Sequence, residues 1–323
     1  MKEKYYKIIN LVLISIIILL LPIPRYKVDL PGRGRLVSDT YEFVDETEQS
    51  IYFPYVLARN ANVFYYISSF FRNDIDLYQY KESFFRDDDY ETITEIGRES
   101  VNEAFYNALI WLHNYKELEH EITNQRIVVK EVLDESDFDL KPGDLLIKAD
   151  GVKLDTSDDL KEIFESYNNE IVNIVVLRDD EQIELSGTLI YDDELERYLV
   201  GFLAVDDFDL KTDIGFEISD QRRMIGSSGG LATALSIYYT YNEVDLPFDV
   251  YATGTINRNG DVFKIGGVKQ KLIGADKRAD LFVFPKDNEE EVKDIIDQFD
   301  ISTEVIFVDN VEEAINIINN KVK

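Results

Sequence analysis

The segment 226–230 reads Gly-Ser-Ser-Gly-Gly and fits the pattern G-x-S-x-G, which can present a serine nucleophile on a turn before a helix. In α/β-hydrolases, the catalytic histidine follows that serine in the chain. The two histidines of this chain, His113 and His120, both precede it, so a triad in hydrolase order is excluded. A subtilisin-like order would have to use one of these histidines, and no motif supports either as a catalytic base.

A lysine is the next candidate base for this serine. It can act as a base only while its amine is neutral, and burial can lower its pKa from about 10.4 far enough for that near pH 7. Four lysines downstream of the serine are in range: Lys264, Lys269, Lys271 and Lys277. The residue types therefore favour serine-lysine chemistry and leave the choice of lysine open.

Two sequence blocks around these residues resemble a known family. Residues 224–235 (MIGSSGGLATAL) resemble the G-P-S-A-G-L block of Lon proteases. Residues 252–271 (ATGTINRNGDVFKIGGVKQK) resemble the family's T-G-x-I, G-x-V and I-G-G-[LV]-K-x-K motifs, in the same order. The interval of 271 − 228 = 43 residues is that of the Lon dyad. The resemblance implies that Ser228 is the nucleophile and Lys271 the general base, with Lys269 as an exposed neighbour.

The resemblance also implies supporting roles around the dyad. Thr253 falls on the family's threonine, whose hydroxyl holds the lysine amine in place. Gly226 keeps the register of the motif, and Gly229 and Gly230 would let a substrate backbone approach closely. A serine at a helix start has backbone N–H groups and the positive end of the helix dipole beside a developing oxyanion.

Three positions beside the nucleophile depart from the family. Ser227 and Gly229 stand where Lon proteases usually have proline and alanine, and Ile225 stands where many members have aspartate. These departures support an alternative hypothesis, in which the proteolytic domain is catalytically inactive. The chain would then be a membrane-tethered PDZ scaffold that binds peptides.

The composition excludes several other classes of function. The chain has 323 residues, 45% of them hydrophobic, which is enough for two globular units. Its formal net charge of −30 repels nucleic acid. It has no cysteine and only two histidines, so a thiol nucleophile and a zinc site are both disfavoured, and we expect no cofactor. The sequence contains no G-x-x-x-x-G-K-[ST] loop, which indicates proteolysis without ATP.

The N-terminal residues predict a membrane anchor. Ile8–Ile23 is uncharged and follows three lysines, Lys2, Lys4 and Lys7. About 17 apolar residues are the lower limit for crossing a bilayer core, and no small-x-small signal-peptidase site follows. We expect residues 1–24 to form one uncleaved transmembrane helix, residues 25–40 a juxtamembrane linker, and the catalytic domain to lie outside the cytoplasm.

The remaining chain predicts an α/β (α+β) proteolytic domain that is interrupted by a second domain. Residues 41–122 contain strand-like runs and an amphipathic helix at 99–115 and would form the first part of the Lon-like domain. Residues 123–191, with Leu140-Lys-Pro-Gly-Asp144 before a strand, resemble a PDZ domain, which binds extended peptides at a sheet edge. Residues 192–323 would complete the Lon-like domain and carry the dyad.

The layout resembles the membrane-anchored, PDZ-containing Lon-like proteases of Gram-positive bacteria. It implies a serine endopeptidase that cleaves peptides or unstructured protein segments. The expected partners are thus a peptide or unfolded substrate and the membrane, and a homo-oligomer is suggested by the ring-forming habit of Lon domains. The substrate's identity is not encoded in any motif of the chain.

Overall fold

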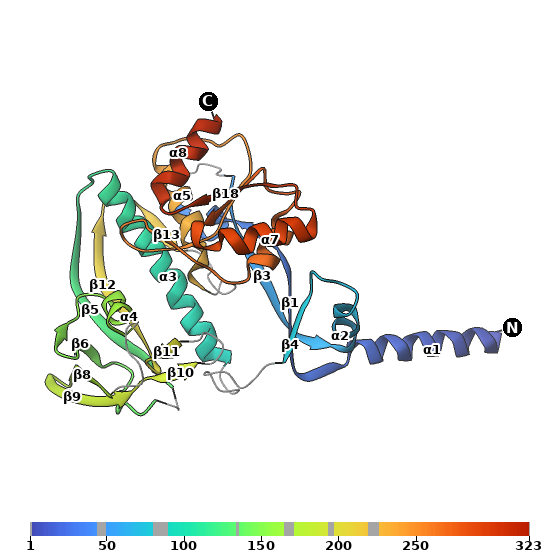
Figure 1. Cartoon of the computed structure of the whole chain (residues 1–323), viewed down its shortest axis with the longest axis horizontal. Coiled ribbons are helices and arrows are strands. Elements are labelled where there is room, and N and C mark those ends of the chain that lie inside the picture. Colours follow the sequence, from blue (N-terminus) through green and yellow to red (C-terminus); the bar gives the residue numbers. More distant parts are fainter. Residues whose placement is uncertain are drawn as a thin grey trace.

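The computed structural model describes residues 2–43, 50–79, 90–133, 136–164, 171–192, 197–218 and 226–322. The body that carries Ser228 and Lys271 is built on one mixed sheet, and a smaller sheet domain lies beside it (Figure 1). Ile225, one of the three departures from the Lon motif, lies outside the described residues.

The main sheet has six strands that come from both ends of the chain. Across the sheet they are β18 (Glu304–Val308), β17 (Leu281–Pro285), β14 (Val250–Ala252), β3 (Ile51–Asn62), β1 (Pro22–Leu36) and β4 (Asp76–Gln79). β14 runs parallel to β17 and β3, and β17 runs parallel to β18. β1 runs antiparallel to both of its neighbours, β3 and β4.

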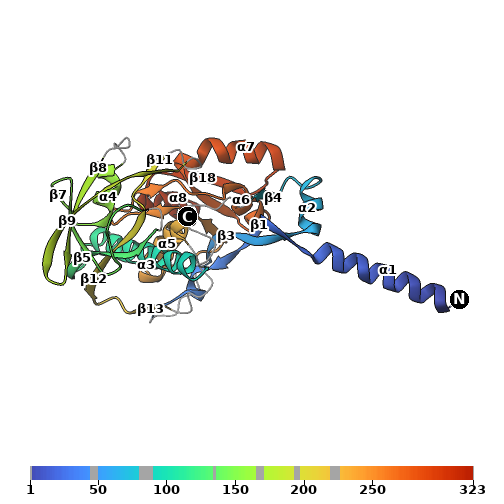
Figure 2. The same ribbon diagram turned by 90° about the horizontal axis from the view of Figure 1, so that it is seen from below.

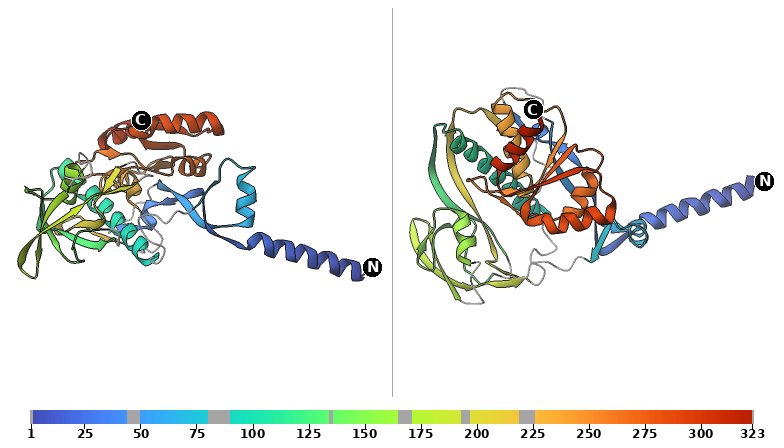
Figure 3. Two further views of the ribbon diagram at one scale, coloured as in Figure 1. Left: turned by 60° about the horizontal axis from the view of Figure 1, so that its bottom comes forward. Right: turned by 45° about the horizontal axis from the view of Figure 1, so that its top comes forward.

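Helices cover both faces of this sheet, as the views in Figures 1 and 3 agree. One face packs against α3 (Tyr90–Tyr115), α5 (Gly230–Tyr241) and α8 (Val311–Val322), and the other against α6 (Val268–Ala275) and α7 (Glu289–Phe299). In β17, Leu281 and Val283 lie in the first core, and Phe282 and Phe284 in the second. A strand buried on both faces is a continuous apolar run, which explains the sequence LFVFP.

The amphipathic helix predicted at residues 99–115 is confirmed as the C-terminal part of α3. Its apolar face is buried, including Val101, Phe105, Leu109 and Leu112. This face shares one core with α5 and with Ile51 and Phe53 of β3. Segments that lie before and after the smaller domain in the sequence therefore pack together.

The smaller domain, residues 120–212, is called the insert domain below. Its sheet has the order β12 (Phe202–Thr212), β5 (His120–Val132), β6 (Leu145–Ala149), β8 (Ile171–Arg178) and β9 (Glu181–Thr188), with β7 (Val152–Lys153) beside β6. Leu160 and Phe164 of α4 (Ser157–Phe164) close its core. The predicted limit at residue 191 omits β12, which belongs to this sheet because it pairs antiparallel with β5 along most of its length (Figure 2).

Short elements complete the described chain. They are η1 (Val37–Asp39), β2 (Tyr41–Phe43), α2 (Val63–Ser69), β10 (Ile190–Asp192), β11 (Arg197–Leu199), β13 (Phe216–Ile218), η2 (Ser227–Gly229), β15 (Thr255–Ile256), β16 (Val262–Phe263) and η3 (Lys286–Asn288). β15 and β16 form a hairpin, β2 pairs with β13, and β10 pairs with β11.

The predicted linker at residues 25–40 is wrong, because most of it is the strand β1. The strand continues through Pro31-Gly-Arg-Gly34 with a shift of register against β3. A Cβ at Gly32 would lie 2.0 Å from the carbonyl oxygen of Tyr55. The glycine therefore permits close pairing of β1 with β3 and does not provide flexibility.

The predicted transmembrane helix at residues 1–24 is not supported. α1 (Lys2–Leu20) projects from the body, and α2 lies at its base (Figures 1 and 3). None of the helices in the described ranges has the length and apolar character needed to cross a bilayer. The reason is that the charged residues lie inside α1, and its uncharged part, Ile8 to Leu20, spans only about 20 Å at 1.5 Å per residue, against about 30 Å for a bilayer core.

Candidate active site

Ser228 lies on the η2 turn, which leads directly into α5. Gly226 precedes the turn with a φ of 100°, a conformation that favours glycine. The carbonyl oxygen of Ser228 accepts hydrogen bonds from Gly254 N (2.8 Å) and Thr253 Oγ1 (3.0 Å). These two bonds fix the serine turn to the segment that follows β14.

Lys271 reaches the serine from α6. Its Nζ donates hydrogen bonds to Ser228 Oγ at 3.0 Å and Thr253 Oγ1 at 3.4 Å, and the residue is 5% exposed. α6 begins after Gly267, which has a φ of 67°. A Cβ at that position would lie 2.5 Å from a methyl group of Val56 on β3. Glycine at the helix start thus allows α6 to pack closely on β3 with Lys271 directed at the serine.

Burial lowers the pKa of Lys271 from 10.5 to about 8. In the described part of the chain, its amine makes hydrogen bonds to the two hydroxyls and has no carboxylate within ion-pair distance. A pKa of about 8 leaves roughly a tenth of the amine neutral at pH 7, against about one part in 3,000 for an unburied lysine. The site therefore holds a neutral amine within hydrogen-bond reach of a serine hydroxyl, which is the geometry of a general base and a nucleophile.

The structure separates the four candidate lysines. Lys264 and Lys277 are exposed. Lys269, two residues before Lys271, is an exposed neighbour in the prediction, but it is partly buried and forms an ion pair with Asp76 of β4. Lys271 is the lysine of this group whose amine reaches the serine turn.

Of the two glycines after the serine, Gly230 has different surroundings from those predicted. A Cβ at Gly230 would lie 3.0 Å from a side-chain carbon of Ile256, so this glycine serves the packing of α5 against β15 and not the approach of a substrate. The N–H groups of Gly230 and Leu231 already donate to Ser227 O and Gly254 O, so neither is available to an oxyanion. A Cβ at Gly229 would meet only an ordinary contact with Phe53, at 4.0 Å.

Sequence reasoning missed two polar contacts near the serine turn. Ser227 Oγ lies 3.0 Å from Thr255 Oγ1, so this serine is bonded to β15. Asn107 on α3 is 7% exposed and donates to the carbonyl oxygen of Ile256 at 3.0 Å. A signal for Asn107 was present, because it is a polar residue between apolar positions of a helix that is otherwise buried on that face. The Ser227 contact had no signal in the sequence.

The histidines lie at the junction with the insert domain. His113 is buried, with 1% of its surface exposed. Its Nε2 lies 2.6 Å from Thr212 Oγ1, and burial lowers its pKa. His120 begins β5 and is in ring contact with His113. Within the described ranges, no group of three or more His, Asp or Glu side chains is arranged to hold a metal ion.

The C-terminal part of the chain matches a known family. Residues 224–320 match the family model of the Lon protease (S16) C-terminal proteolytic domain. The Lon protease of Aquifex aeolicus is 33% identical over 95 residues, and that of Solibacter usitatus is 32% identical over 93 residues. Each alignment covers 28% of this chain and 12% of the relative. Residues 224–320 are thus similar to the Lon proteolytic domain, and the chain spans a small part of the length of these curated relatives.

Solved structures provide a second comparison. The PDZ domains of SdrC-like proteins from Listeria monocytogenes and Listeria innocua are 23% and 22% identical to part of this chain, both with a TM-score of 0.23. Each alignment covers 24% of this chain, and 86% and 92% of those chains. At this score the likeness does not define a fold, and the description of the insert domain rests on its own strand pairing.

Proposed function

We propose that the chain is a serine endopeptidase that cleaves peptides or unstructured protein segments with Ser228 as nucleophile and Lys271 as general base. One observation carries the proposal: a buried amine with a pKa of about 8 lies 3.0 Å from a serine hydroxyl. The match of residues 224–320 to the Lon proteolytic domain supports the same chemistry.

The reaction requires no group beyond the chain and water. The neutral Lys271 amine takes the proton of Ser228 as the hydroxyl oxygen attacks the peptide carbonyl, and a tetrahedral oxyanion forms. The ammonium returns this proton to the departing amine, which leaves an acyl-enzyme. Water, deprotonated by the same amine, attacks the ester, and the ammonium then gives this proton to Ser228 Oγ as the bond between this oxygen and the acyl group breaks, which releases the new carboxyl end and restores the dyad. The hydroxyl of Thr253 keeps the Lys271 amine beside Ser228.

The dyad is tested with a purified full chain and an unfolded, labelled polypeptide. Ser228→Ala should abolish cleavage and also labelling by a fluorophosphonate, which reacts with activated serines. Ser186→Ala is the control, because this serine lies on β9 of the insert domain, away from the serine turn, and its hydroxyl is bonded to Asn173. Cleavage by Ser228→Ala, or unchanged labelling of that variant, would remove the proposal. A protein that is never labelled would favour the alternative of an inactive scaffold.

We also propose that the insert domain is PDZ-like and binds the substrate as an added strand on β12. β12 is an edge strand that pairs with β5, and α4 packs beside it. Unpaired N–H and C=O groups of an edge strand are a template for an extended peptide. A separate expectation is that cleavage proceeds without ATP, because the sequence contains no G-x-x-x-x-G-K-[ST] loop. Adding ATP and magnesium to the assay checks it.

The site of action is a separate proposal: membrane attachment through α1, with the catalytic body outside the cytoplasm. The side chains of α1 from Ile8 to Leu20 include many exposed apolar groups, which favour insertion into a lipid surface. Fractionation of cells, and protease accessibility of the body in intact cells, would test the two parts. A homo-oligomer stays a prediction, to be measured by light scattering.

A further inference from the structure

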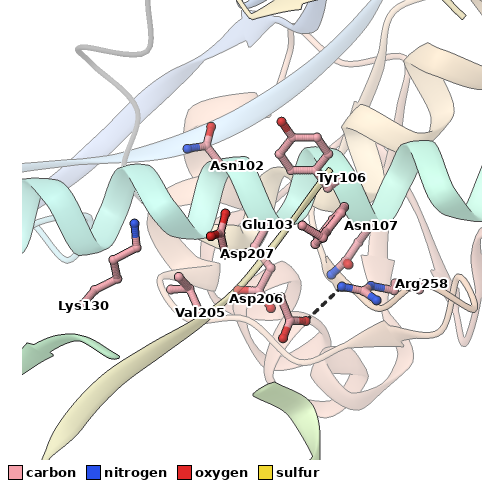
Figure 4. A pocket seen from close by; sticks show the side chains of 10 residues that line it. Asn102, Glu103, Tyr106, Asn107, Lys130, Val205, Asp206, Asp207 and Arg258 are labelled. Atoms are coloured by element: carbon pink, nitrogen blue, oxygen red, sulfur yellow. Dashed lines mark hydrogen bonds and ion pairs between the residues drawn. The ribbon is translucent and has the colours of Figure 1, made fainter. Parts of the chain in front are cut away.

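An arginine of the body contacts the insert domain in a small cavity of about 130 Å³ between α3 and β12 (Figure 4). Arg258 follows β15 and donates from Nη2 to Asp206 Oδ2 on β12 at 3.0 Å. Its guanidinium carbon lies 4.8 Å from the ring centroid of Phe208, also on β12. The side chains of Arg258 and Asp206 are 21% and 10% exposed, so water screens this pair less than a surface ion pair.

The carboxylate of Asp206 joins three elements. Its Oδ1 accepts a hydrogen bond from the backbone N–H of Ser157, the first residue of α4, at 2.7 Å. Its Oδ2 accepts the bond from Arg258. A displacement of α4 relative to β12 therefore disturbs the same side chain that holds the arginine.

The segment 254–258, which carries Arg258, is also hydrogen-bonded to the serine turn. Thr255 Oγ1 is bonded to Ser227 Oγ, and Gly254 exchanges backbone hydrogen bonds with Ser228 and Leu231. Only a few residues separate these bonds from Arg258. Two sets of hydrogen bonds, joined by the backbone from Gly254 to Arg258, thus connect α4 of the insert domain with the turn that carries Ser228.

We propose that Asp206 and Arg258 are positioning residues that transmit the position of the insert domain to the serine turn. This inference rests on the proposed function, because it concerns the reactivity of Ser228. In the intact chain the ion pair keeps the β15–β16 hairpin, and with it the serine turn, in its reactive place. A peptide that binds between β12 and α4 changes the environment of Asp206 and so acts on the distant nucleophile.

The chain has a built-in reporter of the hairpin. Trp111 is the only tryptophan in the sequence and is 2% exposed. A Cβ at Gly260, in the turn of the β15–β16 hairpin, would lie 2.4 Å from its indole ring, so the hairpin packs directly on it. Trp111 emission therefore detects movement of the hairpin without any measurement of activity.

The test compares Arg258→Met and Asp206→Asn with Arg126→Met in the full chain. Arg126 is the matched control, because it forms an ion pair with Asp207, the next residue of β12, but lies within the insert domain. Breaking the Asp206–Arg258 pair should lower the rate of fluorophosphonate labelling at Ser228 by about tenfold and change Trp111 emission. Arg126→Met should change neither.

A double-mutant cycle and thermal melting separate positioning from loss of fold. In the double variant, Asp206→Asn with Arg258→Met, Ser228 should be labelled no more slowly than in either single variant, and the melting transition should stay cooperative. Three results would each overturn the inference. They are labelling of Ser228 in Arg258→Met at the wild-type rate, a change in Trp111 emission without slower labelling, and additive losses of labelling rate in the double variant. A wild-type chain that is not labelled would contradict the proposed function. In that case, unchanged Trp111 emission in both single variants would also overturn the proposed connection between the Asp206–Arg258 pair and the hairpin.

Discussion

The two faces of α6 carry lysines with opposite surroundings. Lys271 faces Ser228 and Thr253, is buried, and has hydroxyl groups as its hydrogen-bond partners. Lys269 faces β4, where Asp76 forms an ion pair with it. Burial lowers the pKa of Lys271 and so favours its neutral form. The comparison teaches that burial and the position of the amine, and not the residue type, decide which lysine can serve as a base.

The largest expected effect is on the rate of peptide cleavage when each of the two lysines is replaced. Lys271→Met should reduce peptide cleavage by at least about a thousandfold, since it removes the general base, whereas Lys269→Met should cost only a few-fold. Initial rates on the same unfolded substrate measure both. Lys271→Arg tests the chemistry further, because a guanidinium stays protonated and should be as inactive. An active Lys271→Met variant would end the comparison.

The second effect concerns stability. Between pH 8 and pH 10.5 the unfolded chain binds one more proton at Lys271 than the folded chain, so stability rises with pH across this window. Below pH 8 the folded state bears the full cost of a buried ammonium, on the order of 3 kcal/mol. Lys271→Met should therefore raise the free energy of unfolding at pH 7.

This stability difference should disappear in alkaline solution. Chemical denaturation at pH 7 and near pH 10.5 compares the wild type with Lys271→Met, and Lys269→Met serves as the control that loses stability at pH 7. If Lys271→Met were less stable than the wild type at pH 7, Lys271 would not be a destabilised, buried amine in the folded chain.

The third effect is the pH dependence of the serine's reactivity. Labelling of Ser228 should fall about tenfold for each pH unit below 8 and level off above about pH 9, because the reactive form has a neutral Lys271. Lys269→Met should leave the midpoint in place. A profile with a midpoint near 6.5 would instead assign the base to a histidine.

Local motifs made it possible to predict Ser228 and Lys271 from the sequence. Residues two apart on a helix lie on opposite faces, so the spacing of Lys269 and Lys271 already predicts different surroundings. The order of the glycine-rich blocks identified Ser228 and Lys271, and the structure brings these two together. Their catalytic roles stay a prediction.

The partner of Lys269 and the strand β1 could not be predicted from the sequence. Asp76 pairs with Lys269 across 193 residues, and nothing local marks that contact. β1 was missed because Gly32 and Gly34 look like a flexible linker, while they permit close contacts with Tyr55 and Tyr251. Gly274 of α6 is similar, since a Cβ there would lie 1.8 Å from Gly32 O. Such glycines encode close approach of backbones, which only the assembled fold reveals.

The smallest expected effect tests the ion-paired face of α6 alone. Asp76 accepts hydrogen bonds from Lys269 and Gln270, and it ties β4 to the helix that carries Lys271. Asp76→Asn removes the charge but keeps the size and an acceptor oxygen, so cleavage should fall by no more than about twofold. The melting temperature should fall by a few degrees at low salt and less at high salt, because salt screens a partly exposed pair. A loss comparable to that of Lys271→Met, measured in the same assay, would mean that the ion pair positions the base, and the two faces of α6 would then act as one site.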